Sequence, residues 1–184
     1  MLVLHDPLRQ TDLPRGCVAT IGNFDGMHVG HQQIVRGVVE RARELGRPSA
    51  VITFHPHPLS IVAPGRVPRQ ILTLAQKEEL LREMGVEAML VVPFTHDFSC
   101  WTADRFIEEF LVRALDVKEV RIGRDFCFGA GREGNLQLLT AAGARFGFDV
   151  HGIDDVKVRG IRVSSSIVRD AISRGAMHIV TMAL

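Results

Sequence analysis

Two histidines three positions apart, His28 and His31, follow a glycine-rich turn and are the residues best suited to chemistry in this 184-residue chain. The segment at residues 20–31 reads Thr-Ile-Gly-Asn-Phe-Asp-Gly-Met-His-Val-Gly-His, which predicts a strand, a turn and the first turn of a helix. Glycine lets a backbone approach a ligand closely, and a helix N-terminus offers free N–H groups and partial positive charge to an anion. The segment therefore predicts a polyphosphate site formed, with the two histidines, by Gly22, Asn23, Phe24, Asp25, Gly26 and Gly30.

This turn is neither a GxxxxGK[ST] phosphate loop nor a GxGxxG dinucleotide fingerprint. A lone histidine is more often a capping or core residue, but a pair at this spacing after such a turn favours function. A metal pair is the weaker interpretation, because further zinc ligands are not evident in the sequence. We expect no side-chain ligand motif for a metal.

A second segment, residues 53–58, reads Thr-Phe-His-Pro-His-Pro. Prolines fix the backbone and remove N–H groups, which predicts a stiff wall against which a flat ligand could lie. The spacing alone fits an ordinary strand exit equally well. The candidate wall residues are Phe54, His55, Pro56, His57 and Pro58.

A third segment, residues 123–129, reads Gly-Arg-Asp-Phe-Cys-Phe-Gly. In an extended segment Phe126 and Phe128 point to the same side, and we expect at least one of them to lie in the core. Asp125, at a predicted strand end, could bind the polar edge of a ring. Gly123 is the candidate for close approach to a nucleotide.

A fourth segment starts the last predicted helix with three hydroxyls, Ser164, Ser165 and Ser166. Arg169 follows three or four residues later and shares a helical face with them. An arginine fork suits phosphate oxygens. An ordinary N-cap with a solvated arginine would explain this segment alone, but beside the first turn a phosphate site is the better interpretation.

Alternating strands and helices must position these segments. Apolar runs predict five strands, and 3.6-residue periodicity and capping residues predict the helices between them. This pattern indicates an α/β fold: a doubly wound, Rossmann-like, mostly parallel five-stranded sheet with helices on both faces and a small β appendage near the C-terminal part. Ligands bind beyond the carboxyl ends of such strands, so the segments that follow strands should share one rim. The strands are expected at residues 17–21, 49–54, 86–92, 118–123 and 148–153, the helices at 29–45, 73–84, 103–115, 134–146 and after Ser164 or Ser165, and a hairpin at 156–163.

Composition argues for one ordinary globular domain over residues 1–184, with a core at about 17–175. The chain is 46% hydrophobic and 23% charged with a net charge of +1, so no global field attracts it to nucleic acid or to a membrane. Three scattered cysteines fit a reducing, cytoplasmic compartment. Neither a membrane span nor a signal peptide is predicted from the sequence.

The four segments together resemble a known family. Residues 22–31 resemble the HxGH signature of the nucleotidylyltransferase superfamily, and residues 163–169 resemble its Ser-Ser-x-x-x-Arg element. The Thr-Phe-His-Pro-His-Pro and Gly-Arg-Asp-Phe-Cys-Phe-Gly-x-x-Arg segments narrow the resemblance to the adenylyltransferase (FAD synthetase) module of bacterial bifunctional riboflavin kinase/FMN adenylyltransferases. It covers residues 17–175, nearly the whole chain.

The resemblance implies transfer of AMP from ATP to FMN, giving FAD and pyrophosphate, with Mg²⁺ bound through the phosphates. It implies that His28, His31, Ser165 and Arg169 are catalytic and that FMN binds the Phe54–Pro58 wall and Asp125, Phe126 and Phe128. The implied ATP contacts are Gly22, Asn23, Phe24, Asp25, Gly26, His28, Gly30, His31, Gly123, Ser164, Ser165, Ser166 and Arg169.

Two departures qualify this resemblance. Ser166 stands where the family usually has threonine, which keeps the hydroxyl. Family members normally continue into a C-terminal riboflavin kinase module, which the sequence lacks, so the kinase activity is not expected here. The alternatives are another adenylyl- or cytidylyltransferase with a different phosphate acceptor, and a flavin or nucleotide sensor without turnover.

Overall fold

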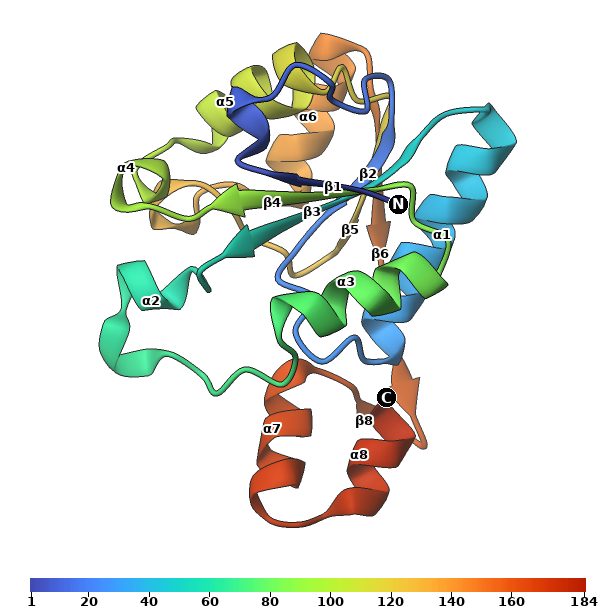
Figure 1. The fold of residues 1–184 in the computed structure, drawn as a ribbon, viewed down its shortest axis with the longest axis vertical. Coiled ribbons are helices and arrows are strands. Elements are labelled where there is room, and N and C mark those ends of the chain that lie inside the picture. The colour runs from blue at the N-terminus through green and yellow to red at the C-terminus, as the bar shows by residue number, and fades with distance from the viewer.

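A six-stranded sheet forms the centre of the computed structural model, which describes residues 1–184 (Figure 1). The strand order is β1-β4-β3-β2-β5-β6, and every neighbouring pair is parallel. The chain passes outward from β2 to β3 and β4 and then returns to β5 and β6, so the direction of winding reverses between β2 and β5. The strands are β1 (Leu2–His5), β2 (Val18–Ile21), β3 (Ser49–His55), β4 (Ala88–Pro93), β5 (Glu119–Gly123) and β6 (Asp149–Ile153).

The parallel α/β prediction is confirmed, but the predicted number of strands was wrong. The missing strand is β1, an edge strand of four residues that pairs only with β4. Its sequence, Leu-Val-Leu-His, is apolar over three residues, but the strand is short and lies at the sheet edge, where Leu2 is 47% exposed.

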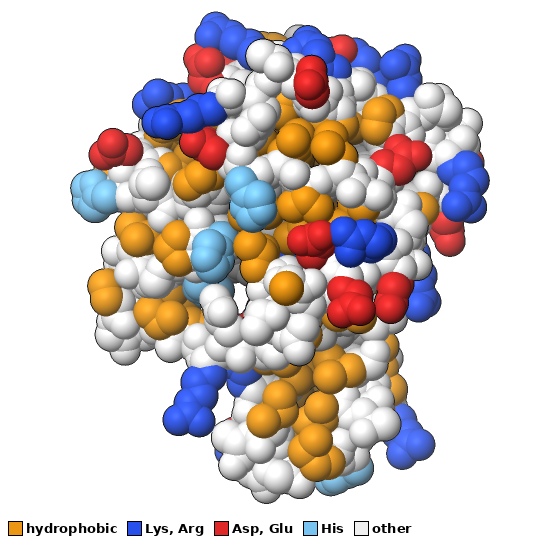
Figure 2. Space-filling view, viewed as in Figure 1, with side chains coloured by type: hydrophobic (Ala, Val, Ile, Leu, Met, Phe, Trp, Pro, Cys, Tyr) orange, Lys and Arg blue, Asp and Glu red, His pale blue; other side chains and the backbone are white.

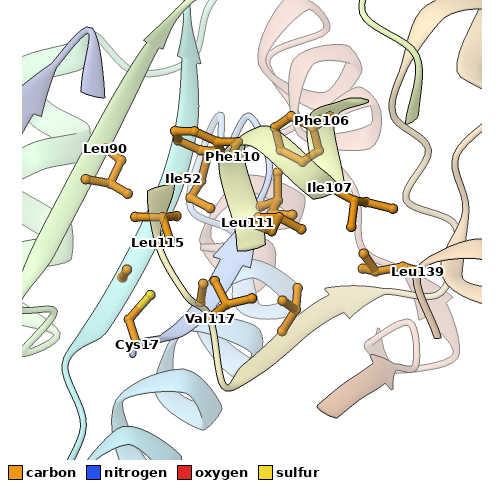
Figure 3. Close-up of a cluster of buried hydrophobic side chains, with 14 of the residues drawn as sticks. Cys17, Ile52, Leu90, Phe106, Ile107, Phe110, Leu111, Leu115, Val117 and Leu139 are labelled. Atoms are coloured by element: carbon orange, nitrogen blue, oxygen red, sulfur yellow. The ribbon is translucent and has the colours of Figure 1, made fainter. Parts of the chain in front are cut away.

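Helices cover both faces of the sheet (Figure 1). Side chains alternate along a strand, and therefore Ile52 of β3 joins one core cluster while its neighbour Val51 joins another. The cluster around Ile52 packs against residues 103–115 and α6 (Leu136–Phe146), and the cluster around Val51 packs against α1 (Val29–Leu45) and α3 (Leu74–Glu83). Figure 3 shows the first cluster, in which Phe110, Leu111 and Leu115 are fully buried.

Capping signals in the sequence fix several helix ends. The Thr73–Gln76 capping box at the start of α3 is present, and Thr102 Oγ1 accepts the Arg105 N–H at the start of α5 (Ala103–Arg105). Gly46 ends α1 in the left-handed conformation, with φ +60°.

Three predicted elements differ from the structure. The predicted α-helix at residues 103–115 is α-helical only over α5 and continues as a π-helix, Phe106–Ala114. The predicted helix at 134–146 begins at Leu136, because Asn135 caps it. The proline-rich loop after β3 contains the short helix α2 (Leu59–Val62), and α4 (His96–Ser99) follows β4.

Residues 157–184, which we call the C-terminal arm, lie at one end of the sheet (Figure 1). Figure 2 shows hydrophobic side chains on the surface of this arm, where Ile172 and Met177 are exposed. The predicted hairpin is confirmed as β7 (Lys157–Val158) and β8 (Ile161–Arg162), and it is followed by α7 (Ser165–Ser173) and α8 (Met177–Ala183). A small apolar cluster of Val163, Val168 and Ala183 packs the arm against Val29 and Ile71. Gln32 Nε2 also donates to the carbonyl of Leu184, at 2.7 Å.

The far half of α1 is fixed to the sheet by polar contacts. Glu119, at the start of β5, is fully buried, and its Oε2 accepts from Arg41 Nε of α1 at 2.8 Å. Arg121 Nη1 donates to the carbonyl of Gly37 in the middle of α1, at 2.8 Å. Helix α1 is therefore held along its length as well as at its capped start. None of the helices is long and apolar enough to cross a membrane.

Candidate functional site

A cavity of about 490 Å³ opens at the carboxyl ends of β2, β5 and β6, between the start of α1 and the C-terminal arm. This is the switch point at which open α/β sheets bind ligands. Segments 22–31 and 123–132 share its rim, as predicted from their positions after strands, and residues 162–169 of the C-terminal arm also lie there. The other segment predicted at this rim, residues 55–58, contributes only His57. Of the predicted site residues, the cavity is lined by Gly22, Asn23, Phe24, Asp25, His28, Gly30, His31, His57, Gly123, Asp125, Phe126, Ser164, Ser165, Ser166 and Arg169.

The two histidines lie face to face at the start of α1. Their ring centroids are 3.6 Å apart, with 20° between the ring planes. His28 is the N-cap residue rather than part of the first turn, and its Nδ1 accepts the backbone N–H of His31 at 3.3 Å. A Cβ at Gly30 would lie 3.2 Å from the His28 ring, so glycine at this position lets the ring lie close over the helix start.

Both imidazoles are neutral in the free protein at neutral pH. Burial lowers the pKa of His28 from 6.5 to about 4. Burial also lowers the pKa of His31 well below 6.5, with smaller effects from His28, Lys77 and Arg169. A neutral imidazole whose Nδ1 accepts a hydrogen bond carries its proton on Nε2, so His28 Nε2–H is a donor for a ligand. His31 Nδ1 is buried without a hydrogen-bond partner.

Lys77 of α3 lies beneath the same turn and was missed in the sequence analysis. Its Nζ donates to the carbonyl of Asn23 at 2.6 Å and to Thr53 Oγ1 at 3.1 Å. The residue is only 7% exposed, and burial lowers its pKa from 10.5 to about 8. Lys77 therefore fixes the course of the turn and adds positive charge below it. A lysine within an amphipathic helix carries no sequence signal that separates it from a solvated residue.

Asp25 connects the turn to two distant segments. Its Oδ1 accepts the backbone N–H groups of Ile71 and Leu72 at 2.9 and 3.0 Å. Its Oδ2 lies 2.6 Å from Arg169 Nη2. The Asp25–Arg169 pair is thus a partly buried contact between residues 144 positions apart in the sequence.

The three serines make different contacts. Ser164 is the N-cap of α7, and its Oγ accepts the N–H of Ile167. Ser165 donates its hydroxyl hydrogen to the carbonyl of Asp25, at 2.7 Å. Ser166 makes no side-chain hydrogen bond within the protein, so Ser164 and Ser166 retain a hydroxyl hydrogen for a ligand.

Only part of the predicted wall at residues 54–58 lies at the cavity. His57 lines it, and its Nδ1 accepts the N–H of Leu59, which also lines it. Phe54 instead packs against Phe94 and Phe98, with ring centroids 5.7 and 6.1 Å away. His55, Pro56 and Pro58 do not line the cavity.

The side chains of the third segment, residues 123–132, also lie partly at the cavity and partly in the core. Phe126 lines the cavity, whereas Phe128 is 7% exposed and packs against Phe106 in the core. Asp125 pairs with Arg162. Gly26 does not line the cavity. Its φ is +87°, and a Cβ there would lie 2.9 Å from Ile71 Cδ1, so the turn requires glycine for its own conformation.

Several cavity residues were not predicted as site residues. Some of them flank strand ends, and others lie in or just before the β7–β8 hairpin. Ile34, Leu59 and Pro68 come from α1, α2 and the loop before α3. Position after a strand could have indicated only those at the strand ends. Arg162 joins Asp155 as well as Asp125, and Arg124 joins Asp154. The unpredicted lining residues are Ile21, Ile34, Leu59, Pro68, Cys127, Arg132, Ile153, Asp154, Asp155, Val156, Arg162 and Val163.

The parallel sheet, the histidine pair at a helix N-terminus and the serine–arginine helix opposite it are the features expected of the α/β nucleotidyltransferase class. Residues 10–167 match the sequence profile of the FAD synthetase family. The chain belongs to the FAD synthetase family, as its four segments predict.

Curated relatives agree with this assignment. The chain is 42% identical over 158 residues to the bifunctional riboflavin kinase/FMN adenylyltransferase of Escherichia coli K12, covering 86% of this chain and 50% of that protein. The proteins of the same name from Pseudomonas fluorescens and Haemophilus influenzae are 42% and 38% identical, over 86% and 90% of this chain and 51% and 54% of theirs. The chain thus spans about half the length of these curated relatives.

Solved structures share the fold. A Streptococcus pneumoniae protein described as a macrolide-efflux protein superposes with a TM-score of 0.81 at 27% identity, covering 94% of this chain and 58% of that one. Pantoate-beta-alanine ligase from Francisella tularensis superposes with a TM-score of 0.56 at 11% identity, covering 90% of this chain and 71% of that one. The second likeness concerns the fold alone.

Proposed function

We propose that this chain is an FMN adenylyltransferase, which transfers AMP from ATP to FMN and releases pyrophosphate. The observation that carries the proposal is one cavity bounded on one side by the neutral His28–His31 pair and on the other by Ser164, Ser166 and Arg169. This cavity, of about 490 Å³, falls within the size range of small-molecule sites, roughly 300–1,000 Å³. Family membership favours ATP and FMN as its substrates.

In this reaction an oxygen of the FMN phosphate attacks the α-phosphorus of ATP, and the bond from that phosphorus to the pyrophosphate oxygen breaks. The second pKa of a phosphate monoester is about 6, so FMN is mostly dianionic at neutral pH and needs no general base. The protein's task is to position both phosphates and to stabilise the charge that moves to pyrophosphate.

Helix α1 serves one side of the ATP phosphates. His28 Nε2–H and the free N–H groups at the start of α1 donate to phosphate oxygens. Binding the polyanion favours the imidazolium form, so at least one histidine gains a proton when ATP binds. The initially neutral pair therefore gains positive charge in response to the substrate.

Helix α7 serves the other side. Arg169 makes no hydrogen bond within the protein through Nη1, and its guanidinium lines the cavity. Ser164 and Ser166 supply hydroxyl donors beside it. The apolar flank of the cavity near Ile21, Ile34 and Phe126 can hold a flat ring.

Mg²⁺ would be held mainly through the phosphate oxygens of ATP, because Mg²⁺ prefers oxygen ligands and is commonly bound together with substrate phosphates. The carboxylates that line the cavity, Asp125, Asp154 and Asp155, are each paired with Arg162 or Arg124. When bound, the ion would neutralise part of the negative charge of the ATP phosphates. No group of three or more His, Cys, Asp or Glu side chains is arranged to hold a metal.

Only adenylyl transfer is assigned to this chain, because it spans about half of its bifunctional relatives. Riboflavin phosphorylation would belong to a fused kinase module, which would supply FMN. Free cysteines and the nucleotide substrates favour a cytoplasmic location.

The test is a chromatographic assay with purified protein, ATP and Mg²⁺. FMN is expected to give FAD and pyrophosphate in equal amounts, and riboflavin is expected to give no FMN. FAD formation should distinguish this function from transfer to phosphopantetheine or glycerol phosphate. Tight binding of FMN and ATP without pyrophosphate release would support a nucleotide sensor and overturn the proposal.

His28→Ala tests the role of the histidine pair. Removal of one donor to a developing charge typically costs on the order of 10²–10³ in rate, so kcat should fall by about that factor. His178→Ala on the exposed surface of α8 is the matched control, and its rate should equal that of the wild type. Near-normal turnover of His28→Ala would refute the assignment of this residue.

A further inference from the structure

Asp25 is the acidic residue of the glycine–histidine turn, and its contacts differ from those expected of an ATP ligand. Its carboxylate accepts from two backbone N–H groups, those of Ile71 and Leu72, and from the guanidinium of Arg169. Its backbone carbonyl accepts from the hydroxyl of Ser165. One residue thus joins the turn, the segment leading into α3 and helix α7.

These contacts leave Asp25 poorly suited to bind a nucleotide. The residue is 5% exposed, and both carboxylate oxygens already have strong donors. A negative charge beside a triphosphate would repel it unless a cation compensated that charge. Arg169 supplies the compensation through an ion pair of 2.6 Å.

The same contacts hold Arg169 in a useful orientation. Its Nε donates to the carbonyl of Arg69 at 2.9 Å, and its Nη2 donates to Asp25. A guanidinium has five N–H groups, so three remain for a ligand, including both on Nη1. Asp25 can therefore keep its bond to Arg169 while Arg169 binds a phosphate.

Helix α7 needs this fixation because little else holds its start. Its apolar contact with the body is a small cluster around Val163, Val168 and Ala183. Ser165 donates its only hydroxyl hydrogen to the carbonyl of Asp25, so it holds the start of α7 in place. Ser164 and Ser166 remain as hydroxyl donors to phosphate. The two side chains that attach the first turns of α7 to the glycine–histidine turn, Ser165 and Arg169, thus both bind Asp25.

We propose that Asp25 is a positioning residue, which fixes Arg169 and the start of α7 against the glycine–histidine turn without contacting substrate. This inference rests on the proposed adenylyl transfer. It replaces the direct ATP contact expected for Asp25 and the direct phosphate contact expected for Ser165.

The test is a double-mutant cycle with Asp25→Asn and Arg169→Met. Asparagine keeps an Oδ1 acceptor for the amides of Ile71 and Leu72 but presents no anion to Arg169. We expect kcat/KM for ATP to fall on the order of 10- to 100-fold in each single variant. If Asp25 acts through Arg169, Asp25→Asn should cost less than about threefold in the Arg169→Met background.

A full, multiplicative loss in the double variant would show that Asp25 acts on substrate directly and would overturn the proposal. Unchanged kcat/KM in Asp25→Asn would overturn it as well. Asp170→Asn is the matched control, because it breaks the exposed Asp170–Arg174 pair on the same helix and should leave kcat/KM unchanged.

Amide hydrogen exchange without substrate separates this proposal from the proposed function. Residues 165–173 should exchange at least several-fold faster in Asp25→Asn than in the wild type, while the sheet strands should be unaffected. If Asp25→Asn does not fold, Ser165→Ala should show the same change in a milder form. Equal exchange in the wild type and the folded variant would refute positioning, even for a protein that formed no FAD.

Discussion

The neutral His28 predicts a specific loss of stability in acid. The side chain is buried with a pKa of about 4, against 6.5 for the same group in the unfolded chain. Between these values the unfolded state binds more protons than the folded state. Stability therefore rises with pH across this window and falls on acidification.

The magnitude follows from the two pKa values. The full difference corresponds to about 3 kcal/mol, and about 2 kcal/mol of it is lost between pH 7 and pH 5. The buried His31 acts in the same direction. A contribution of this size is a large fraction of the ~5–15 kcal/mol that stabilises a typical domain.

Urea unfolding followed by far-ultraviolet circular dichroism at pH 7, 6 and 5 measures this loss. In His28→Gln the decrease in unfolding free energy between pH 7 and pH 5 should be about 2 kcal/mol smaller than in the wild type. His178→Gln, on the exposed surface of α8, is the control for losing a histidine. Parallel pH profiles for the wild type and His28→Gln would refute the conclusion that His28 is buried in its neutral form.

Two further predictions concern ATP binding and packing. NMR titration of the imidazole resonances should show that ATP raises the pKa of His28 or His31 from its lowered value, and an unchanged pKa in the complex would contradict the phosphate contact. Gly129→Ala should cost on the order of 2–5 kcal/mol in urea unfolding, because φ is +75° there and a Cβ would lie 2.6 Å from Ala103 N. Gly131→Ala, with φ +62° and nothing within 4 Å, should cost only about 1 kcal/mol; equal losses at the two glycines would show that the contact with Ala103 does not matter.

Local signals made much of the fold predictable. The buried strands are continuous apolar runs, and the capping residues Thr73, Thr102 and Gly46 mark helix ends that the structure contains. The edge strand β1 was missed because its apolar run, residues 2–4, is too short to distinguish a strand from a loop. The π-helix Phe106–Ala114 was unpredictable because its residues have the same apolar periodicity that an α-helix requires.

The candidate site was predictable in outline but not in its contacts. Placement after a strand predicted that His28 and Asp125 would share a rim, and the serine–arginine pattern at a helix start predicted that Arg169 would join the phosphate site. The partner of each polar side chain depends on distant segments. Asp25 and Arg169 are 144 positions apart, and Lys77 reaches the turn from another helix, so a single sequence shows neither contact.

The contact between the buried Glu119 and Arg41 makes the two sides of the cavity differ in how firmly they are attached to the sheet. Helix α1 is hydrogen-bonded to Glu119 and Arg121 of the sheet and is capped by His28, so the two histidines at its start are attached firmly to the sheet. Helix α7 meets the body through Asp25, Arg69 and a few apolar side chains. A ligand that contacts both helices would therefore add new contacts between the C-terminal arm and the sheet, and should slow amide exchange in α7 more than in α1.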